Sequence, residues 1–146
     1  MKRKEFIKVC GAACLSASPL MILLESCGLS NYYANYAVNN KKIIIKKSEF
    51  LLVQKDKTIE RKFVLIKNEH LNYPICVFKL TDGTYSALLM ECTHNGCELQ
   101  NQGNYLICPC HGSEFSNKGV VQNPPAESNL ISYTITTDNE NIFINL

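Results

Sequence analysis

The sequence predicts an all-β protein that folds as an antiparallel β sandwich in one small domain. Short apolar runs recur after residue 40 and are separated by turn-forming residues, whereas no apolar pattern of helical period occurs beyond residue 27. The chain has 146 residues, and the part after residue 27 has the size of a single domain. A net charge of +2 gives no indication of a nucleic-acid partner.

Eight segments are predicted as strands because they are short and rich in β-branched and aromatic residues. In chain order they are 43–45, 50–53, 63–66, 75–80, 85–90, 105–107, 130–136 and 142–146. Two connections have the composition of tight turns, namely 81–84 (TDGT) and 138–141 (DNEN). Strands joined by tight turns pair as antiparallel neighbours, and a sandwich buries their apolar sides.

Two segments carry cysteine and histidine at the spacing of metal ligands. They are CTHNGC at residues 92–97 and CPCHGSEF at residues 108–115, and each offers one thiolate and one imidazole. The residues between them can form a short hairpin that brings both pairs to one site. The four candidate ligands are Cys92, His94, Cys108 and His111. Cys97 and Cys110 are left over, and a disulfide between them could tie one loop to the other.

These motifs, in this order, resemble the loops of the Rieske 2Fe-2S proteins, which carry C-T-H-x-G-C and C-P-C-H-G-S. The resemblance covers the later part of the chain and includes Asn123-Pro124-Pro125-Ala126, which resembles the family's proline loop. It implies a Rieske-type 2Fe-2S cluster as cofactor. It also implies that a small cluster-binding subdomain, at about residues 92–117, extends from the β sandwich.

Carried over residue by residue, the resemblance implies that Cys92 and Cys108 ligate the inner iron, and that His94 and His111 ligate the outer iron. It also implies a disulfide between Cys97 and Cys110.

The resemblance further suggests how the cluster is tuned. Ser113 matches the serine that bonds a bridging sulfide, which raises the reduction potential. Phe115 stands where quinol-oxidising members usually carry a tyrosine that bonds a cysteine ligand. We therefore expect a potential below the top of the family range, with Phe115 packed in the core.

Two other interpretations of the motifs are open. A closed zinc site also uses thiolate and imidazole ligands, but it explains neither the second cysteine pair nor the Gly-Ser that follows His111. A structural disulfide with incidental histidines is possible in an exported protein. Two of the three histidines nevertheless fall inside the motifs, which favours a metal centre.

The first 27 residues have the features of an export signal, with a basic start and an apolar stretch from about residue 9 to residue 24. Residues 3–8 (RKEFIK) resemble a twin-arginine signal in which lysine replaces the second arginine. Residues 24–27 resemble a bacterial lipoprotein cleavage box, with Cys27 as the lipidated residue. The alternative is an uncleaved N-terminal anchor. Residues 28–40 are predicted as a polar tether to the Rieske domain at 41–146.

The sequence thus predicts a membrane-anchored one-electron carrier that faces the periplasm or the outer side of the cytoplasmic membrane and is not catalytic alone. The leading function is the iron-sulfur subunit of a quinol-oxidising, cytochrome bc-like complex, with a redox partner subunit, a cytochrome-like acceptor and the membrane as partners. The alternatives are the small subunit of an arsenite oxidase type of periplasmic oxidoreductase, and the Rieske ferredoxin of an oxygenase. A further alternative, from a different functional class, is a redox-silent lipoprotein whose loops are held together by zinc.

Overall fold

The computed structural model describes residues 31–54 and 57–146. Their secondary structure consists of strands and one short 3-10 helix, η2. In chain order the elements are β1 (Tyr36–Asn39), β2 (Lys42–Lys46), η2 (Lys47–Phe50), β3 (Leu51–Gln54), β4 (Lys57–Glu60), β5 (Phe63–Ile66), β6 (Ile75–Lys79), β7 (Tyr85–Leu89), β8 (Gln100–Asn101), β9 (Tyr105–Ile107), β10 (Glu114–Ser116), β11 (Val121–Asn123), β12 (Ser132–Thr137) and β13 (Asn141–Asn145). Within these ranges, no helix is long and apolar enough to span a bilayer. The predicted export signal and Cys27 lie outside the described residues.

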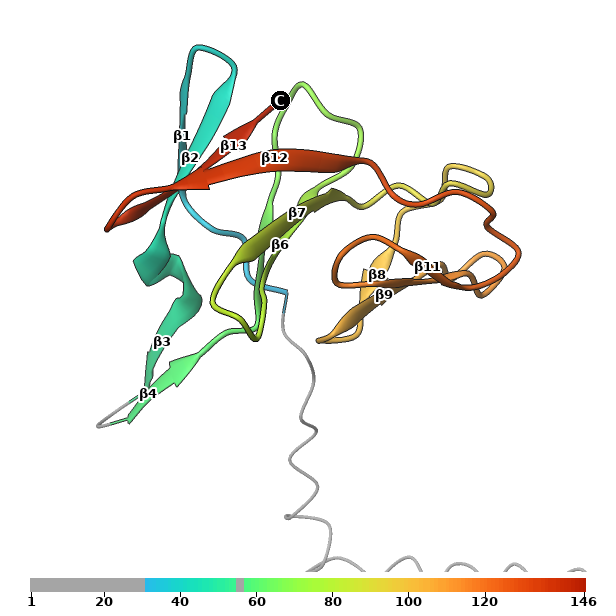
Figure 1. Ribbon diagram of the computed structural model, residues 1–146, viewed down its shortest axis with the longest axis horizontal. Helices are drawn as coiled ribbons and strands as arrows, with labels where there is room; N and C mark the ends of the chain where they lie inside the picture. The colour runs from blue at the N-terminus through green and yellow to red at the C-terminus, as the bar shows by residue number, and fades with distance from the viewer. Residues whose placement is uncertain (1–30, 55–56) are drawn as a thin grey trace, which may run out of the picture.

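The strands form three sheets (Figure 1). The largest has seven strands in the order β1-β2-β13-β12-β7-β6-β5. A second sheet has the order β11-β10-β9-β8, and β3 and β4 form a separate two-stranded sheet. Paired strands are antiparallel throughout these sheets. Figure 1 shows the four-stranded sheet at one end of the molecule and the two-stranded sheet at the other.

Strands β5, β6 and β7 form the central layer and are buried on both faces. Successive side chains of a strand point to opposite faces, so Phe63 and Leu65 contact one hydrophobic cluster while Val64 and Ile66 contact another. The base core lies between the central layer and strands β2 and β13, and it contains Ala34, Ile43, Ile45, Phe50, Val64, Ile66, Ile75, Val77, Ala87, Ile142 and Ile144. The predicted antiparallel sandwich is thereby confirmed.

The loop-side core lies between the other face of the central layer and the four-stranded sheet. It contains Phe63, Leu65, Cys76, Phe78, Leu88, Met90, Cys92, Leu99, Leu106, Cys108, Phe115, Ala126 and Leu130. Its packing brings Gly119, which has φ +81°, so near Leu88 that a Cβ atom there would lie 2.9 Å from a methyl carbon. Glycine is therefore required at this contact for both space and conformation.

Both predicted turns have the expected chemistry. Gly83 has φ +81°, a conformation that glycine adopts at little cost, and Asp82 Oδ1 accepts a hydrogen bond from the backbone of Thr84. At the other turn, Asp138 Oδ1 accepts hydrogen bonds from the backbone of Glu140 and Asn141. These carboxylates hold the β6–β7 and β12–β13 hairpins closed.

The prediction that residues 28–40 form a polar tether is wrong for the described part of that range. Ala34 is buried in the base core, and residues 36–39 form β1, which pairs with β2. The hairpin turn is Asn40-Lys41, and both residues have positive φ. Two such residues make the tight turn whose twist matches antiparallel strands. The segment has too little apolar periodicity to be recognised as a strand, but β2 supplies it with a partner.

The other predicted strands differ from the observed ones mainly at their ends. Phe50 was expected to begin a strand but ends η2, so β3 begins at Leu51. Four further strands, β4, β8, β10 and β11, were not predicted. Each has two to four residues, which is too short for an alternating apolar pattern to be visible.

Candidate metal centre

The site is built from two loops that share one backbone pattern. The first loop, residues 92–97, precedes β8, and the second loop, residues 108–113, joins β9 to β10. In the first, Cys92 N–H donates to the carbonyl of Cys97 and Gly96 N–H donates to the carbonyl of Cys92, both at 2.8 Å. In the second, Cys108 N–H donates to Ser113 at 2.8 Å and Gly112 N–H donates to Cys108 at 2.9 Å.

The glycine at the fifth position of each loop explains this shared shape. Gly96 has φ +66° and Gly112 has φ +79°, so both lie in the left-handed region that glycine occupies without steric cost. Each loop therefore turns back on its first residue. The spacing that the sequence shows between cysteine and glycine is the spacing that this turn needs.

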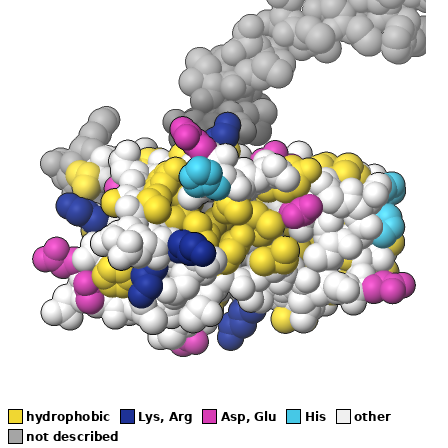
Figure 2. Space-filling model, turned by 90° about the horizontal axis from the view of Figure 1, so that it is seen from above, with side chains coloured by type: hydrophobic (Ala, Val, Ile, Leu, Met, Phe, Trp, Pro, Cys, Tyr) yellow, Lys and Arg dark blue, Asp and Glu magenta, His cyan; other side chains and the backbone are white. Residues whose placement is uncertain are grey.

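The loops place the two candidate thiol ligands inside and the two candidate imidazole ligands outside. Cys92 and Cys108 are only 2% and 1% exposed, and both are free cysteines. His94 and His111 are exposed, and their ring centroids lie 4.9 Å apart with the rings perpendicular. Figure 2 shows histidine side chains at the right-hand end of the molecule, and another histidine side chain well away from that end. Two buried sulfurs below two exposed imidazoles fit a 2Fe-2S cluster with one inner and one outer iron.

The surroundings of Cys92 shift the pKa of its thiol, which must lose its proton to bind a metal. Burial raises the pKa of the Cys92 thiol, and its hydrogen bond with Cys108 raises that pKa further. The backbone N–H groups of His94 and Asn95 act in the opposite direction because they donate to the sulfur. A coordinated thiol is deprotonated by the charge of the metal, and the two N–H donors then stabilise the thiolate.

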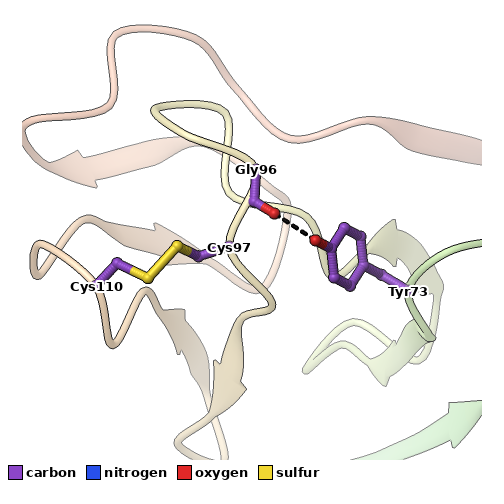
Figure 3. The surroundings of a disulfide bond; sticks show 4 residues. All are labelled: Tyr73, Gly96, Cys97 and Cys110. Atoms are coloured by element: carbon purple, nitrogen blue, oxygen red, sulfur yellow. Dashed lines mark hydrogen bonds between the residues drawn. A yellow bond between two sulfur atoms is a disulfide. The ribbon is translucent and has the colours of Figure 1, made fainter.

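A disulfide joins Cys97, the last residue of the first loop, to Cys110 in the second loop, with an S–S distance of 2.06 Å (Figure 3). The predicted pairing is therefore confirmed. The Sγ atoms of Cys97, Cys108 and Cys110 all lie within 4.8 Å of one another. Two of these three sulfurs are consumed by the disulfide, so the group is not a set of three thiolate ligands. It shows instead that the disulfide lies against the free thiol of Cys108.

The residues after the second loop fold back over it. Ser113 is fully buried, and its Oγ accepts a hydrogen bond of 3.0 Å from the backbone of Ala126. The side-chain amide of Asn123 donates to the carbonyl of Gly112 at 3.2 Å. The predicted proline segment, which contains the cis peptide bond Pro124-Pro125, thus lies against the second loop. Because Ser113 Oγ accepts from Ala126, its own hydrogen is free to be donated to a cluster sulfur.

Phe115 is fully buried and belongs to the loop-side core. Its predicted packing role is confirmed. A phenyl ring carries no hydroxyl, so this position supplies no hydrogen bond to a sulfur of the site.

Two residues that support the first loop were not found from the sequence. Tyr73, in the β5–β6 connection, donates its hydroxyl hydrogen to the carbonyl of Gly96 at 2.5 Å (Figure 3). Thr93 donates its hydroxyl hydrogen to the carbonyl of Ser128 at 2.6 Å. Both bonds join residues more than 20 positions apart. No local pattern signals such contacts, so they emerge only from the fold.

Comparison with known proteins places this site in a family. The family model described as the Rieske [2Fe-2S] domain matches residues 43–134. Among solved structures, the plasma membrane Rieske protein PetC3 of the cyanobacterium Synechocystis PCC 6803 is similar at 30% sequence identity, with a TM-score of 0.52. That similarity covers 58% of this chain and 87% of the other.

Curated relatives match a shorter stretch. The cytochrome b6-f complex iron-sulfur subunit of Prochlorococcus marinus is 42% identical over 55 residues, which are 36% of this chain and 31% of the relative. The ubiquinol-cytochrome c reductase iron-sulfur subunit of Rickettsia typhi is 51% identical over 43 residues, which are 27% of this chain and 24% of the relative. The chain therefore spans less than a third of the length of these relatives.

Proposed function

The chain belongs to the Rieske [2Fe-2S] domain family, and we propose that it transfers single electrons as the iron-sulfur subunit of a quinol-oxidising, cytochrome bc-like respiratory complex. Electron transfer through a 2Fe-2S cluster follows from the family. The role in a quinol-oxidising complex is supported by the relatives named above. The observation that carries the proposal is the pair of exposed imidazoles above two buried thiols.

We assign the cluster ligands to the four residues predicted from the sequence. Cys92 and Cys108 hold the inner iron in the loop-side core, away from solvent. His94 and His111 hold the outer iron at the surface. When bound, such a cluster supplies a one-electron redox centre, and its imidazole ligands place the reduction potential between about −150 and +300 mV.

The exposed imidazoles are the groups that can meet a substrate. Histidine that binds a metal through one ring nitrogen keeps the other nitrogen for a proton or a hydrogen bond. His94 or His111 can therefore accept a hydrogen bond from the hydroxyl of a quinol and take its proton as the electron leaves. Proton and electron uptake are then coupled at this surface.

Ser113 and Phe115 affect the reduction potential expected for the bound cluster. Ser113 has a hydroxyl hydrogen to donate to a sulfur, which stabilises the reduced state and raises the potential. Phe115 offers no such donor. The potential should therefore lie below the top of the family range.

The proposed export and membrane attachment rest on the sequence of the first 27 residues. We propose that residues 1–27 direct export, that Cys27 carries the lipid anchor, and that the head faces the periplasm or the outer side of the cytoplasmic membrane. The Cys97–Cys110 disulfide supports this location because disulfides persist in oxidising compartments.

The test is to measure the reduction potential of the full chain as a function of pH and to record the electron paramagnetic resonance spectrum of the reduced protein. We expect a Rieske spectrum and a positive potential that falls as the pH passes the pKa values of the bound imidazoles. Ser113→Ala should lower the potential without removing the spectrum.

Other outcomes point to the alternatives. A negative potential that does not change with pH near neutrality favours ferredoxin-like transfer and contradicts quinol oxidation. Bound zinc with no Rieske spectrum contradicts the cluster itself. A genomic neighbour that encodes a molybdenum subunit rather than cytochrome b would favour the arsenite oxidase type of complex.

A further inference from the structure

The β3–β4 hairpin forms a sheet of its own. Its strands pair only with each other and extend the molecule at the end opposite the four-stranded sheet (Figure 1). An isolated two-stranded hairpin is at best marginally stable in water. This one nevertheless exposes three large apolar side chains, since Leu51, Val53 and Ile59 are 45%, 71% and 47% exposed.

The apolar side chains project from both faces of the hairpin. Directly paired residues in an antiparallel ladder share a face, and successive residues alternate. Leu51 and Val53 therefore occupy one face, opposite Glu60 and Thr58. Ile59 lies on the other face with its partner Leu52, which is itself partly exposed. A flat protein surface could cover only one of these faces.

Arg61 closes the base of the hairpin. The backbone N–H of Arg61 donates to the carbonyl of Phe50 at 2.6 Å. Its guanidinium donates to the carbonyls of Glu49 and Leu51 at 3.1 and 2.8 Å. These bonds join the end of η2 and the first residue of β3 to the residue that follows β4.

The N-terminal segment of the described chain joins the head at the same place. The guanidinium carbon of Arg61 lies 3.9 Å from the ring centroid of Tyr32. The hydroxyl of Tyr32 donates to a carboxylate oxygen of Glu49 at 2.8 Å, and the backbone of Asn35 donates to the same oxygen. The described chain thus begins beside the hairpin base, and the sequence before it includes the apolar stretch from about 9 to 24.

We propose that the β3–β4 hairpin inserts its apolar side chains into the surface of a lipid bilayer. This inference rests on the proposed membrane attachment, because a chain anchored through its N-terminal segment joins the head beside this hairpin. A fluid lipid interface can surround both apolar faces of a thin hairpin, and burial of apolar side chains there is favourable.

The charges around the hairpin suit an anionic lipid surface. Lys46, Lys57 and Lys62 are exposed on or next to it. Of the described carboxylates near the hairpin, Glu49 accepts a hydrogen bond from Tyr32 and Glu60 forms an ion pair with Lys79, while Glu140 lines the same pocket as Leu51. A lysine close to an anionic leaflet contributes to binding, and the contribution decreases with salt. The loops that carry His94 and His111 flank the four-stranded sheet, which lies at the opposite end of the molecule from the hairpin, so the hairpin contact leaves both histidines accessible (Figure 1).

The chain contains no tryptophan, so one introduced tryptophan is a clean probe. The full chain with Val53→Trp is reconstituted in vesicles of phosphatidylethanolamine and phosphatidylglycerol, with or without lipids brominated on the acyl chains. We expect a blue-shifted emission and at least about twofold quenching by brominated lipid. Val38→Trp is the matched control because Val38 is 57% exposed but lies on β1, in the seven-stranded sheet. It should show neither effect.

A second pair of variants tests whether the apolar faces drive the contact. Ile59→Trp places the probe on the opposite face and should be quenched as well. Adding Val53→Glu to Ile59→Trp should abolish that quenching, whereas adding Val38→Glu should leave it unchanged.

Sedimentation of the vesicles separates this inference from the proposed attachment. Chain that sediments with vesicles while Val53→Trp is quenched no more than Val38→Trp overturns the hairpin contact and leaves the attachment standing. Chain that stays in solution with unaltered emission overturns both. A third outcome is that Val53→Trp shows no quenching with lipid alone, but its emission shifts when a cytochrome b-type subunit is added. That result assigns the hairpin to a protein partner and overturns the lipid proposal.

Discussion

The two halves of this molecule are held together by different kinds of interaction. The base core lies between the central layer and strands β2 and β13, and its members are aliphatic and aromatic side chains that are almost all fully buried. The four-stranded sheet has strands of only two or three residues. Its loops depend on a disulfide and on single hydrogen bonds, which Tyr73 and Asn123 donate and Ser113 accepts.

The difference reflects what each half has to do. Packing of apolar side chains is strong but not directional. Covalent links and hydrogen bonds are directional, and a metal centre needs its ligands at fixed positions. The loops bury Cys92 and Cys108 in the loop-side core, but the imidazoles must reach the surface, so bonds at defined points supplement the packing there. Changes in the loops should therefore affect the cluster. Changes in the base, which is the seven-stranded sheet with its base core, should affect overall stability.

The largest expected effect is the loss of the cluster in Cys108→Ser. A buried hydroxyl replaces the proposed thiolate ligand, so the visible absorption and the Rieske paramagnetic signal should disappear. Cys76→Ser is the matched control, because Cys76 is also a free, fully buried cysteine of the same core and accepts a hydrogen bond from Asn101. It should keep the cluster. A normal Rieske signal in Cys108→Ser would contradict the ligand assignment.

Ile75→Ala should give the largest loss of stability in the base. Ile75 is fully buried in the base core, and removing its side chain leaves a cavity. We expect the free energy of unfolding to fall by about 2–5 kcal/mol, measured by urea unfolding followed by circular dichroism. Val38→Ala, at an exposed site, should change it by less than about 0.5 kcal/mol. Equal effects of the two substitutions would be inconsistent with a base held by packing.

Removal of the disulfide should weaken the loops more than the base. The Cys97–Cys110 link closes a loop with a sequence separation of 13 residues, for which loop-closure entropy gives about 3 kcal/mol. The double variant Cys97→Ser with Cys110→Ser should lose its visible absorption at a lower temperature than the wild type. The far-ultraviolet signal of the base should persist beyond that point. Loss of both signals together would show that the two halves unfold as one unit.

Tyr73→Phe should have a smaller effect, limited to the first loop. It removes the hydroxyl that donates to Gly96, a bond worth about 0.5–1.5 kcal/mol. Hydrogen exchange at the amides of residues 92–97 should increase. Tyr36→Phe is the matched control, since the Tyr36 hydroxyl donates to the carbonyl of Lys67 in the base. It should leave exchange in the loop unchanged, and a similar increase in both variants would contradict a local role for Tyr73.

The smallest effect is expected at an exposed turn of the base. Hydrogen bonds from the backbone of Asn141 and Glu140 lower the pKa of Asp138 below the ordinary aspartate value. A carboxylate with a lowered pKa in the folded state stabilises the fold above its unfolded pKa, and this stabilisation is lost as the pH falls through the folded pKa. Asp138→Asn should therefore be slightly less stable than the wild type near neutrality, with the difference vanishing in acid. A difference that persists in strong acid would exclude this carboxylate as the cause.

Features that depend on a few consecutive residues could be predicted from the sequence, whereas features that depend on residues far apart in the chain could not. The turns at 81–84 and 138–141 were predicted because their chemistry is contained in four residues. The β1 strand was missed because its apolar content is low, and its pairing with β2 is what stabilises it. Tyr73 was missed for a related reason, since it contacts a residue 23 positions away.

The sequence by itself determined the family, the all-β class and the candidate ligands, because two short motifs bring thiols, imidazoles and glycines to fixed spacings. It also determined the disulfide pairing through the resemblance. Only the tertiary structure decided which residues support the loops, how β1 completes the sandwich, and that the β3–β4 hairpin remains uncovered. Contacts between distant parts of the chain depend on how the layers pack, and no local spacing records that packing.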